Sequence, residues 1–126
     1  MRKNFLKQIS RISILGIFLL LLGSFINKNG GTKTVTGEIL DMKCYMVSGA
    51  HGEDHKQCAA TCINGGAPMG ILCDDGKVYL LIKDDKNPSA YDDAKKYAGE
   101  NVILTGTESE KGGVQALTVA EVKMKK

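Results

Sequence analysis

Cysteine and histidine are the residue types of this chain with the clearest capacity for chemistry, and they are concentrated in one stretch. The 126-residue sequence contains 4 Cys and 2 His. Both side chains bind borderline and soft metal ions, and cysteines also form disulfides. Neither occurs from Asp74 to Lys126, so the chemistry of the chain is expected in the segment before it. In order, these residues are Cys44, His51, His55, Cys58, Cys62 and Cys73.

The spacing of three of these residues predicts one face of a helix. His55, Cys58 and Cys62 stand at positions i, i+3 and i+7, which lie on the same side of an α-helix. Cys44 precedes this helix at the end of a predicted strand. Three thiolates and one imidazole suit tetrahedral zinc, so we predict a metal site at Cys44, His55, Cys58 and Cys62. Further candidate ligands are Met42, Met46, His51 and Cys73.

Copper is the alternative ion. Met42, Cys44 and Met46 alternate along the predicted strand, and two thioethers beside a thiol favour Cu(I). The segment Cys58-Ala59-Ala60-Thr61-Cys62 resembles the C-x3-C motif of copper-delivery proteins of the respiratory chain. Those proteins carry the motif on a thioredoxin-like fold with a distant histidine after it, whereas His55 precedes it here. Ordinary core packing is the competing role for the two methionines.

Disulfide formation is the alternative to any metal. Four thiols in an exported domain form an even set, which allows two disulfides. A bridge between Cys58 and Cys62 within one helix would have poor geometry. Bridges between elements are better, with Cys44 joined to one helical cysteine and Cys73 to the other.

The N-terminal segment predicts export. Positions 1–11 contain basic residues and no acid, and residues 12–26 are apolar except for glycine and serine. A basic start before a short apolar stretch is typical of a secretory signal, and the positive-inside bias keeps the N-terminus in the cytoplasm. We expect residues 1–26 to be a cleaved signal peptide or an uncleaved membrane anchor, and residues 27–33 a linker. The remainder is then extracytoplasmic, in the periplasm or at the cell surface.

Composition excludes several classes of partner. The net charge of +3 arises from basic residues in the leader, and the remainder has a net charge of −1 with neither Arg nor Trp. Nucleic-acid binding, which favours a basic face with stacking aromatics, is not expected. Membrane contact is expected only through the N-terminal segment, if it is uncleaved. The expected partner is a metal ion or an unidentified extracytoplasmic protein.

Periodicity predicts a series of short strands and two helices. The alternation and turn signals place helices where apolar spacing is helical and strands where it has a period of two. If Asp75-Gly76 is a two-residue turn, Cys73 pairs with Val78 and faces the interior. The predicted core is Val35, Ile39, Ile71, Leu80, Ile82, Val102 and Leu104. The predicted strands are Thr34–Asp41, Met69–Cys73, Lys77–Lys83, Val102–Thr107 and Val114–Lys123, and the predicted helices are Glu53–Asn64 and 87–97.

This order resembles that of small exported bacterial OB-fold proteins. Tyr97 to Gly106 and Leu117 to Val122 look like the fourth and fifth strands of such domains, with a glycine at the bend. The resemblance implies a mainly β domain, a five-stranded Greek-key barrel over residues 34–124. Residues 44–66 are its Cys/His-containing helical insertion. A curved five-stranded antiparallel sheet with two helices is the alternative.

Catalytic motifs are lacking in the sequence. It has no C-x-x-C redox motif, no C-x-x-C-H haem motif and no glycine-rich phosphate loop. Acid pairs such as Asp74-Asp75 fall at turns, where local hydrogen bonding explains them. We therefore expect a non-enzymatic extracytoplasmic module that binds zinc or copper. The alternative is a disulfide-stapled interaction module that holds no metal.

Overall fold

The computed structural model of the protein describes residues 30–126. The predicted leader, 1–26, and residues 27–29 of the predicted linker lie outside this range. Within it, no helix is long and apolar enough to cross a membrane. The elements, in chain order, are β1 (Thr32–Asp41), α2 (Met42–Ser48), the 3-10 turn η1 (Glu53–His55), α3 (Lys56–Asn64), β2 (Met69–Cys73), β3 (Val78–Ile82), α4 (Pro88–Lys95), β4 (Asn101–Lys111) and β5 (Val114–Met124).

The five strands form one sheet that closes in a ring. The order is β1-β2-β3-β5-β4, and β1 pairs with both of its neighbours, β2 and β4. Ring closure is achieved because β1 is long enough to pair with β4 along Thr32–Glu38 and with β2 along Gly37–Asp41. β3 and β5 are parallel, whereas the other pairs are antiparallel. A purely antiparallel sheet, the alternative suggested by the sequence, is therefore wrong.

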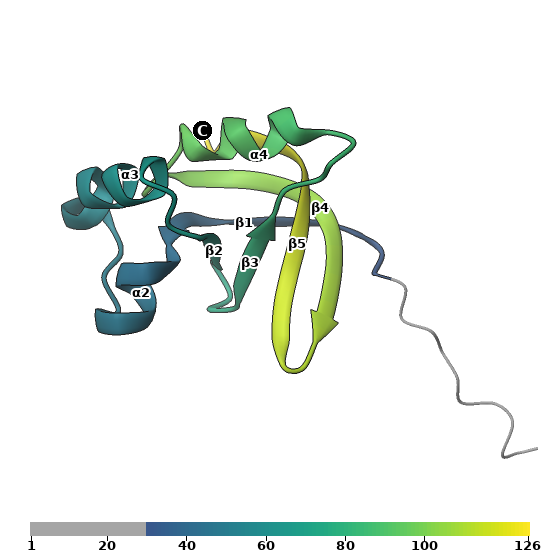
Figure 1. Cartoon of the computed structure of the whole chain (residues 1–126), viewed down its shortest axis with the longest axis horizontal. Helices are drawn as coiled ribbons and strands as arrows, with labels where there is room; N and C mark the ends of the chain where they lie inside the picture. The colour runs from purple at the N-terminus through teal and green to yellow at the C-terminus, as the bar shows by residue number, and fades with distance from the viewer. Residues whose placement is uncertain (1–29) are drawn as a thin grey trace, which may run out of the picture.

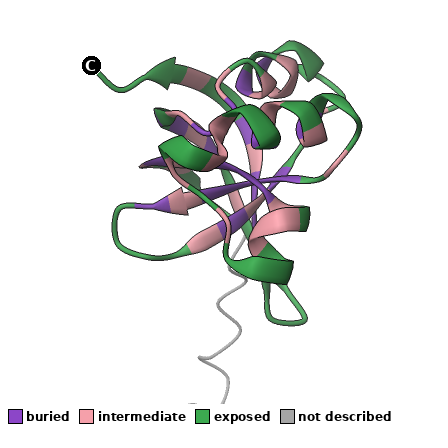
Figure 2. Ribbon diagram, turned by 90° about the vertical axis from the view of Figure 1, so that its left-hand side faces the viewer, coloured by how far each residue is buried: buried purple, intermediate pink, exposed green. Residues whose placement is uncertain are grey.

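The hydrophobic core fills the inside of this ring. Ile39, Ile71, Val102 and Leu104 are all 0% exposed, as the alternation of their strands predicted, and Val35 is partly buried against them. Figure 2 shows the buried residues concentrated along the strands at the centre of the molecule. The helices add small or branched side chains to this core. These are Ala59 and Ile63 of α3 and Ala90 and Ala94 of α4.

The predicted face of β3 is wrong by one residue. Leu72, rather than Cys73, is the partner of Val78, and the N–H of Cys73 donates a hydrogen bond to the carbonyl of Lys77. The turn therefore contains one residue more than the predicted two-residue loop. A shift of one residue exchanges the two faces of a strand. Tyr79 and Leu81 are consequently buried, whereas the predicted core residues Leu80 and Ile82 are half-buried and 39% exposed, respectively.

The segment after β1 is a helix, not the continuation of a strand. Asp41 caps α2 because its side chain accepts hydrogen bonds from the N–H groups of Lys43 and Cys44. The predicted strand alternation of Met42, Cys44 and Met46 is therefore wrong. The described residues form three α-helices rather than two, so the fold is mixed α/β rather than mainly β. Figure 1 shows α2 and α3 at the same end of the sheet, where β1 ends.

Candidate metal centre

Asp41 is the innermost polar residue of this end of the molecule. It is the last residue of β1 and its exposure is only 1%. Its two carboxylate oxygens have different environments. Oδ1 accepts the N–H of Lys43 at 2.9 Å and that of Cys44 at 3.4 Å, whereas Oδ2 is buried without a hydrogen-bond partner. One oxygen therefore begins α2, and the other is left free for a ligand.

The connection from α2 to α3 is anchored to β1. α2 ends at Gly49, whose N–H donates to the carbonyl of Tyr45. The chain then turns through Gly52, whose N–H donates to Oε1 of Glu38 at 2.7 Å. His51 lies beside the same carboxylate, with Nδ1 3.4 Å from Oε2. These contacts return the chain to the end of the sheet, where η1 delivers His55 opposite Asp41.

The core-packing residues of α3 lie on a different side of the helix from its candidate metal ligands. Ala59 and Ile63 are each 2% exposed and pack into the core. His55 and Cys58 belong to one donor group, and Cys62 belongs to a second one. His55 and Cys62 are half-buried, but Cys58 is exposed, so its thiol is not directed into the core as expected from the sequence.

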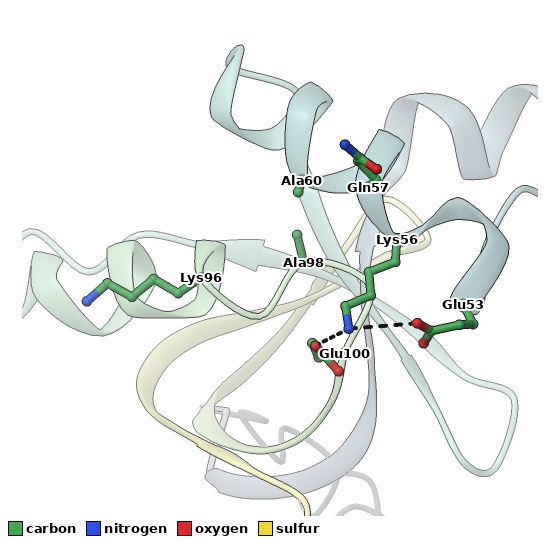
Figure 3. A pocket seen from close by; sticks show the side chains of 7 residues that line it. All are labelled: Glu53, Lys56, Gln57, Ala60, Lys96, Ala98 and Glu100. Atoms are coloured by element: carbon green, nitrogen blue, oxygen red, sulfur yellow. Dashed lines mark ion pairs between the residues drawn. The ribbon is translucent and has the colours of Figure 1, made fainter.

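A third side of α3 is tied to the beginning of β4. Lys56 pairs with Glu100 and lies 3.9 Å from Glu53. Figure 3 shows these side chains around a pocket of about 480 Å³. No cysteine or histidine lines this pocket, whereas the ion pair of Lys56 with Glu100 joins α3 to the start of β4. Its lining residues are Glu53, Lys56, Gln57, Ala60, Lys96, Ala98 and Glu100.

Two overlapping groups of donor atoms result from this arrangement. One consists of Asp41, Cys44 and Cys62, and the other of Cys44, His55 and Cys58. Within each group, every donor atom lies within 4.8 Å of the others. Two sulfurs on a tetrahedral zinc ion would be about 3.8 Å apart, given Zn–S bonds of about 2.3 Å. Small side-chain movements would therefore bring either group onto one ion.

The two groups are linked by an unusual pair of buried atoms. Oδ2 of Asp41 lies 3.8 Å from Nε2 of His55. Among the described residues, these two are the buried side-chain nitrogen and oxygen atoms that have no hydrogen-bond partner. A separation of 3.8 Å is too long for a hydrogen bond. It is close to the separation of about 3.4 Å expected for an oxygen and a nitrogen on one tetrahedral zinc ion.

Electrostatics keep the thiols protonated in the metal-free centre. The adjacent Asp41 carboxylate, together with burial, raises the pKa of Cys44 to about 12. Burial and then the same carboxylate raise the pKa of Cys62. The thiols act on Asp41 by proximity, since Oδ2 forms no well-aligned hydrogen bond. A bound cation would favour loss of the thiol protons, because its positive charge offsets the repulsion that thiolates would otherwise have with the carboxylate.

Asp41 itself is held as a carboxylate. Burial favours a higher pKa for this group, but the nearby thiols of Cys44 and Cys62 and the hydrogen bonds from backbone N–H groups outweigh it and lower the pKa. A negative oxygen is thus available in a buried position. Sequence reasoning missed this residue. The signal present was an aspartate three positions before Cys44, which is the spacing between a helix cap and the third residue of its helix.

The other predicted ligands lie outside both groups. Sδ of Met42 occupies the space over Gly70, where an added Cβ would meet it at 2.2 Å, so this thioether packs against β2. Met46 is 71% exposed. His51 contacts Glu38, and Cys73 is buried at the β2–β3 turn.

The centre is a Cys/His/Asp cluster that could hold a metal ion. Its donors come from the end of β1, from α2 and from the η1–α3 segment, which the ring of strands brings to one edge. Thiolate, imidazole and carboxylate donors together suit a borderline ion better than a hard one. Comparison of the chain with protein-family models, with curated proteins and with solved structures found no match.

Proposed function

We propose that the protein is a metal-binding module that holds zinc in the cluster of Asp41, Cys44, His55, Cys58 and Cys62. The observation that carries this proposal is the pair of Asp41 Oδ2 and His55 Nε2, 3.8 Å apart and without other partners. Buried polar atoms nearly always have partners. One ion bound by both atoms and by the neighbouring thiolates would satisfy them together.

Zinc is favoured over copper by the set of donors. Cu(I) prefers soft sulfur ligands, and the two methionines that would have added thioethers lie elsewhere. A buried carboxylate and an imidazole take their place beside the thiols. Zinc accepts sulfur, nitrogen and oxygen in one tetrahedral site. Cu(I) under reducing conditions is the second ion to test.

The proposed setting is an exported, non-enzymatic domain. The leader supports export, with the domain secreted or tethered outside the cytoplasm. The strand order β1-β2-β3-β5-β4, with β3 and β5 parallel, supports an OB-like barrel as its scaffold. On such scaffolds, activity belongs to the loops and insertions. Here the insertion between β1 and β2 carries every donor of the cluster except Asp41, the last residue of β1.

Zinc titration of the reduced full-length chain tests the proposal. Cys44→Ser removes the donor shared by both groups, whereas His51→Ala alters a neighbouring histidine that belongs to neither. We expect one zinc ion per chain in the wild-type and His51→Ala proteins, and a large loss of affinity in Cys44→Ser. At about 100 times Kd, zinc should add ~2.7 kcal/mol to the free energy of unfolding. Equal melting temperatures with and without zinc or Cu(I) would refute metal binding.

A disulfide-stapled interaction module is the second candidate. All four cysteines are free thiols in the structure, but Sγ of Cys44 lies within 4.8 Å of Sγ of both Cys58 and Cys62. Either pair would need to close to about 2.05 Å to form a bond. Cys73 belongs to neither group, so the second predicted bridge has no support in the structure. Thiol alkylation of the exported protein before and after reduction, read by intact mass, distinguishes a bridge from free thiols.

A further inference from the structure

The two donor groups of the centre differ in their access to solvent. The inner group contains Asp41, which is 1% exposed, together with half-buried Cys44 and Cys62. The outer group contains half-buried Cys44 and His55 together with exposed Cys58. Cys44 belongs to both groups. An ion in the inner group is therefore shielded, whereas one in the outer group has an exposed ligand at its edge.

The number of donors exceeds what one zinc ion uses. Structural zinc is almost always four-coordinate, and the cluster supplies five side chains. Two arrangements with four or fewer protein ligands are available without moving the backbone elements. In the inner one, Asp41, Cys44 and Cys62 are bound together with His55, whose Nε2 lies 3.8 Å from Oδ2 of Asp41, and Cys58 is free. In the outer one, Cys44, His55 and Cys58 are bound, Asp41 and Cys62 are released, and one position is open to an external ligand.

We propose that Cys58 draws the ion from the inner to the outer group, from which it passes to a thiolate-bearing acceptor. The proposal rests on the zinc-binding function above and adds a transfer role to it. A thiolate is the expected acceptor because the ligand to be replaced is itself a thiolate, and exchange between like ligands needs no change of geometry. The exposed side of Cys58 is where such an acceptor can approach.

The exchange conserves charge and involves no redox change. The Cys58 thiol releases its proton to solvent and forms a Zn–S bond as the bonds from zinc to Asp41 and Cys62 break, and the Cys62 sulfur recovers a proton from solvent. The acceptor thiol then loses its proton and binds at the open position. The bonds from zinc to Cys44, His55 and Cys58 break in turn, and the two cysteine sulfurs recover protons from solvent. Metal transfer is thereby coupled to proton exchange at each thiol.

Two substitutions should change the transfer rate in opposite directions. Cys58→Ser removes the outer thiolate and should retain the ion in the inner group, which slows transfer. Asp41→Asn weakens the inner group and should favour the outer arrangement, which accelerates transfer. We expect changes on the order of tenfold in each direction. His51→Ala, outside both groups, should transfer zinc at the wild-type rate.

The experiment mixes zinc-loaded protein with two thiolate acceptors, reduced glutathione and a four-cysteine zinc-finger peptide. Occupancy is measured before mixing, so that rates are compared per bound ion. Slower transfer from Cys58→Ser to both acceptors supports exchange with any thiolate, and slower transfer to the peptide alone supports a protein acceptor. Equal rates for Cys58→Ser and wild type overturn the inference. Failure of the wild-type protein to load zinc would instead refute the proposed function.

Discussion

The Asp41 carboxylate acts on Cys44 in two places, at its backbone N–H and at its thiol. The N–H of Cys44 donates to Oδ1 of Asp41 at 3.4 Å, and the same carboxylate raises the pKa of the Cys44 thiol to about 12. One buried side chain thus ends β1, begins α2 and sets the charge of the centre. The consequence is that the fold of the insertion and the chemistry of the cluster are linked through a single carboxylate.

The first prediction separates the two roles of Asp41. Asn caps helices as well as Asp does, so Asp41→Asn should keep the start of α2 while removing the negative charge. Asp41→Ala removes the cap as well and should lower the free energy of unfolding of the metal-free protein by about 0.5–2 kcal/mol. Both variants should lose much of the stabilisation by zinc. Urea unfolding with and without zinc measures each effect. Full zinc stabilisation of Asp41→Asn would show that the carboxylate is not a ligand.

The second prediction concerns alkaline pH in the metal-free protein. The pKa of Cys44 is raised from 9.0 to about 12, so the folded state retains a proton that the unfolded state loses. The stability contributed by this contact is fully present below about pH 9 and is lost as the pH rises towards about 12. We therefore expect the melting temperature to fall over this range, with Cys62 acting in the same direction.

A variant isolates this effect from other alkaline transitions. Hydrogen bonds to Glu108 and Tyr79 raise the pKa of Lys33, so this lysine also loses its contribution at high pH. Cys44→Ser retains the Lys33 contacts but has no titrating thiol at position 44. Its melting temperature should fall less steeply between pH 9 and 12 than that of the wild-type protein. Parallel curves for the two proteins would show that Asp41 does not hold the thiol proton.

The third prediction compares two adjacent leucines of β3. Leu81 is 3% exposed and faces the core, whereas Leu80 is half-buried on the opposite face. Leu81→Ala should lower the free energy of unfolding by about 2–5 kcal/mol, as expected for a buried leucine. Leu80→Ala should lower it by about 1 kcal/mol, near the centre of the range for single substitutions. Chemical denaturation of both variants measures the difference, and the reverse order would indicate a β3 register shifted by one residue.

Much of the scaffold could be predicted from local patterns. The strand Met69–Cys73 has the predicted bounds, and His55 and Cys58 share one donor group, as their helical spacing predicts. Alternation in β1, β2 and β4 identified four fully buried core residues, namely Ile39, Ile71, Val102 and Leu104. These features depend on residues that are close together in the sequence, so the sequence of this chain was enough to predict them.

The predictions were wrong where the local structure depends on a single residue or on a tertiary contact. The turn after Cys73 is one residue longer than a two-residue loop, and this reversed the expected faces of β3. α2 has only seven residues, too few for a clear periodic signal, and its formation depends on the Asp41 cap. Asp41 was missed as a donor because its burial beside His55 depends on how β1 and α3 meet. No local sequence pattern encodes the packing of α3 against the end of β1.

The last prediction tests the packing of α3 against the end of β1 through a substitution at Gly99. Its φ is +71°, and an added Cβ would lie 2.7 Å from Cα of Lys56 in α3. Gly112, at the β4–β5 turn, has a φ of +58° but nothing within 4 Å of the added Cβ. Both substitutions to alanine require a left-handed backbone, which costs roughly 1–2 kcal/mol. Only Gly99→Ala must also push α3 away from β1.

Gly99→Ala should therefore be the more destabilising substitution and should also weaken zinc binding, because the displacement moves His55 and Cys62 relative to Asp41. Gly112→Ala should lose stability without losing affinity for zinc, since its turn lies outside the insertion. Zinc titrations and urea unfolding of the two variants, run side by side, give both quantities. If Gly99→Ala binds zinc as tightly as Gly112→Ala does, the position of α3 against the end of β1 does not control the centre.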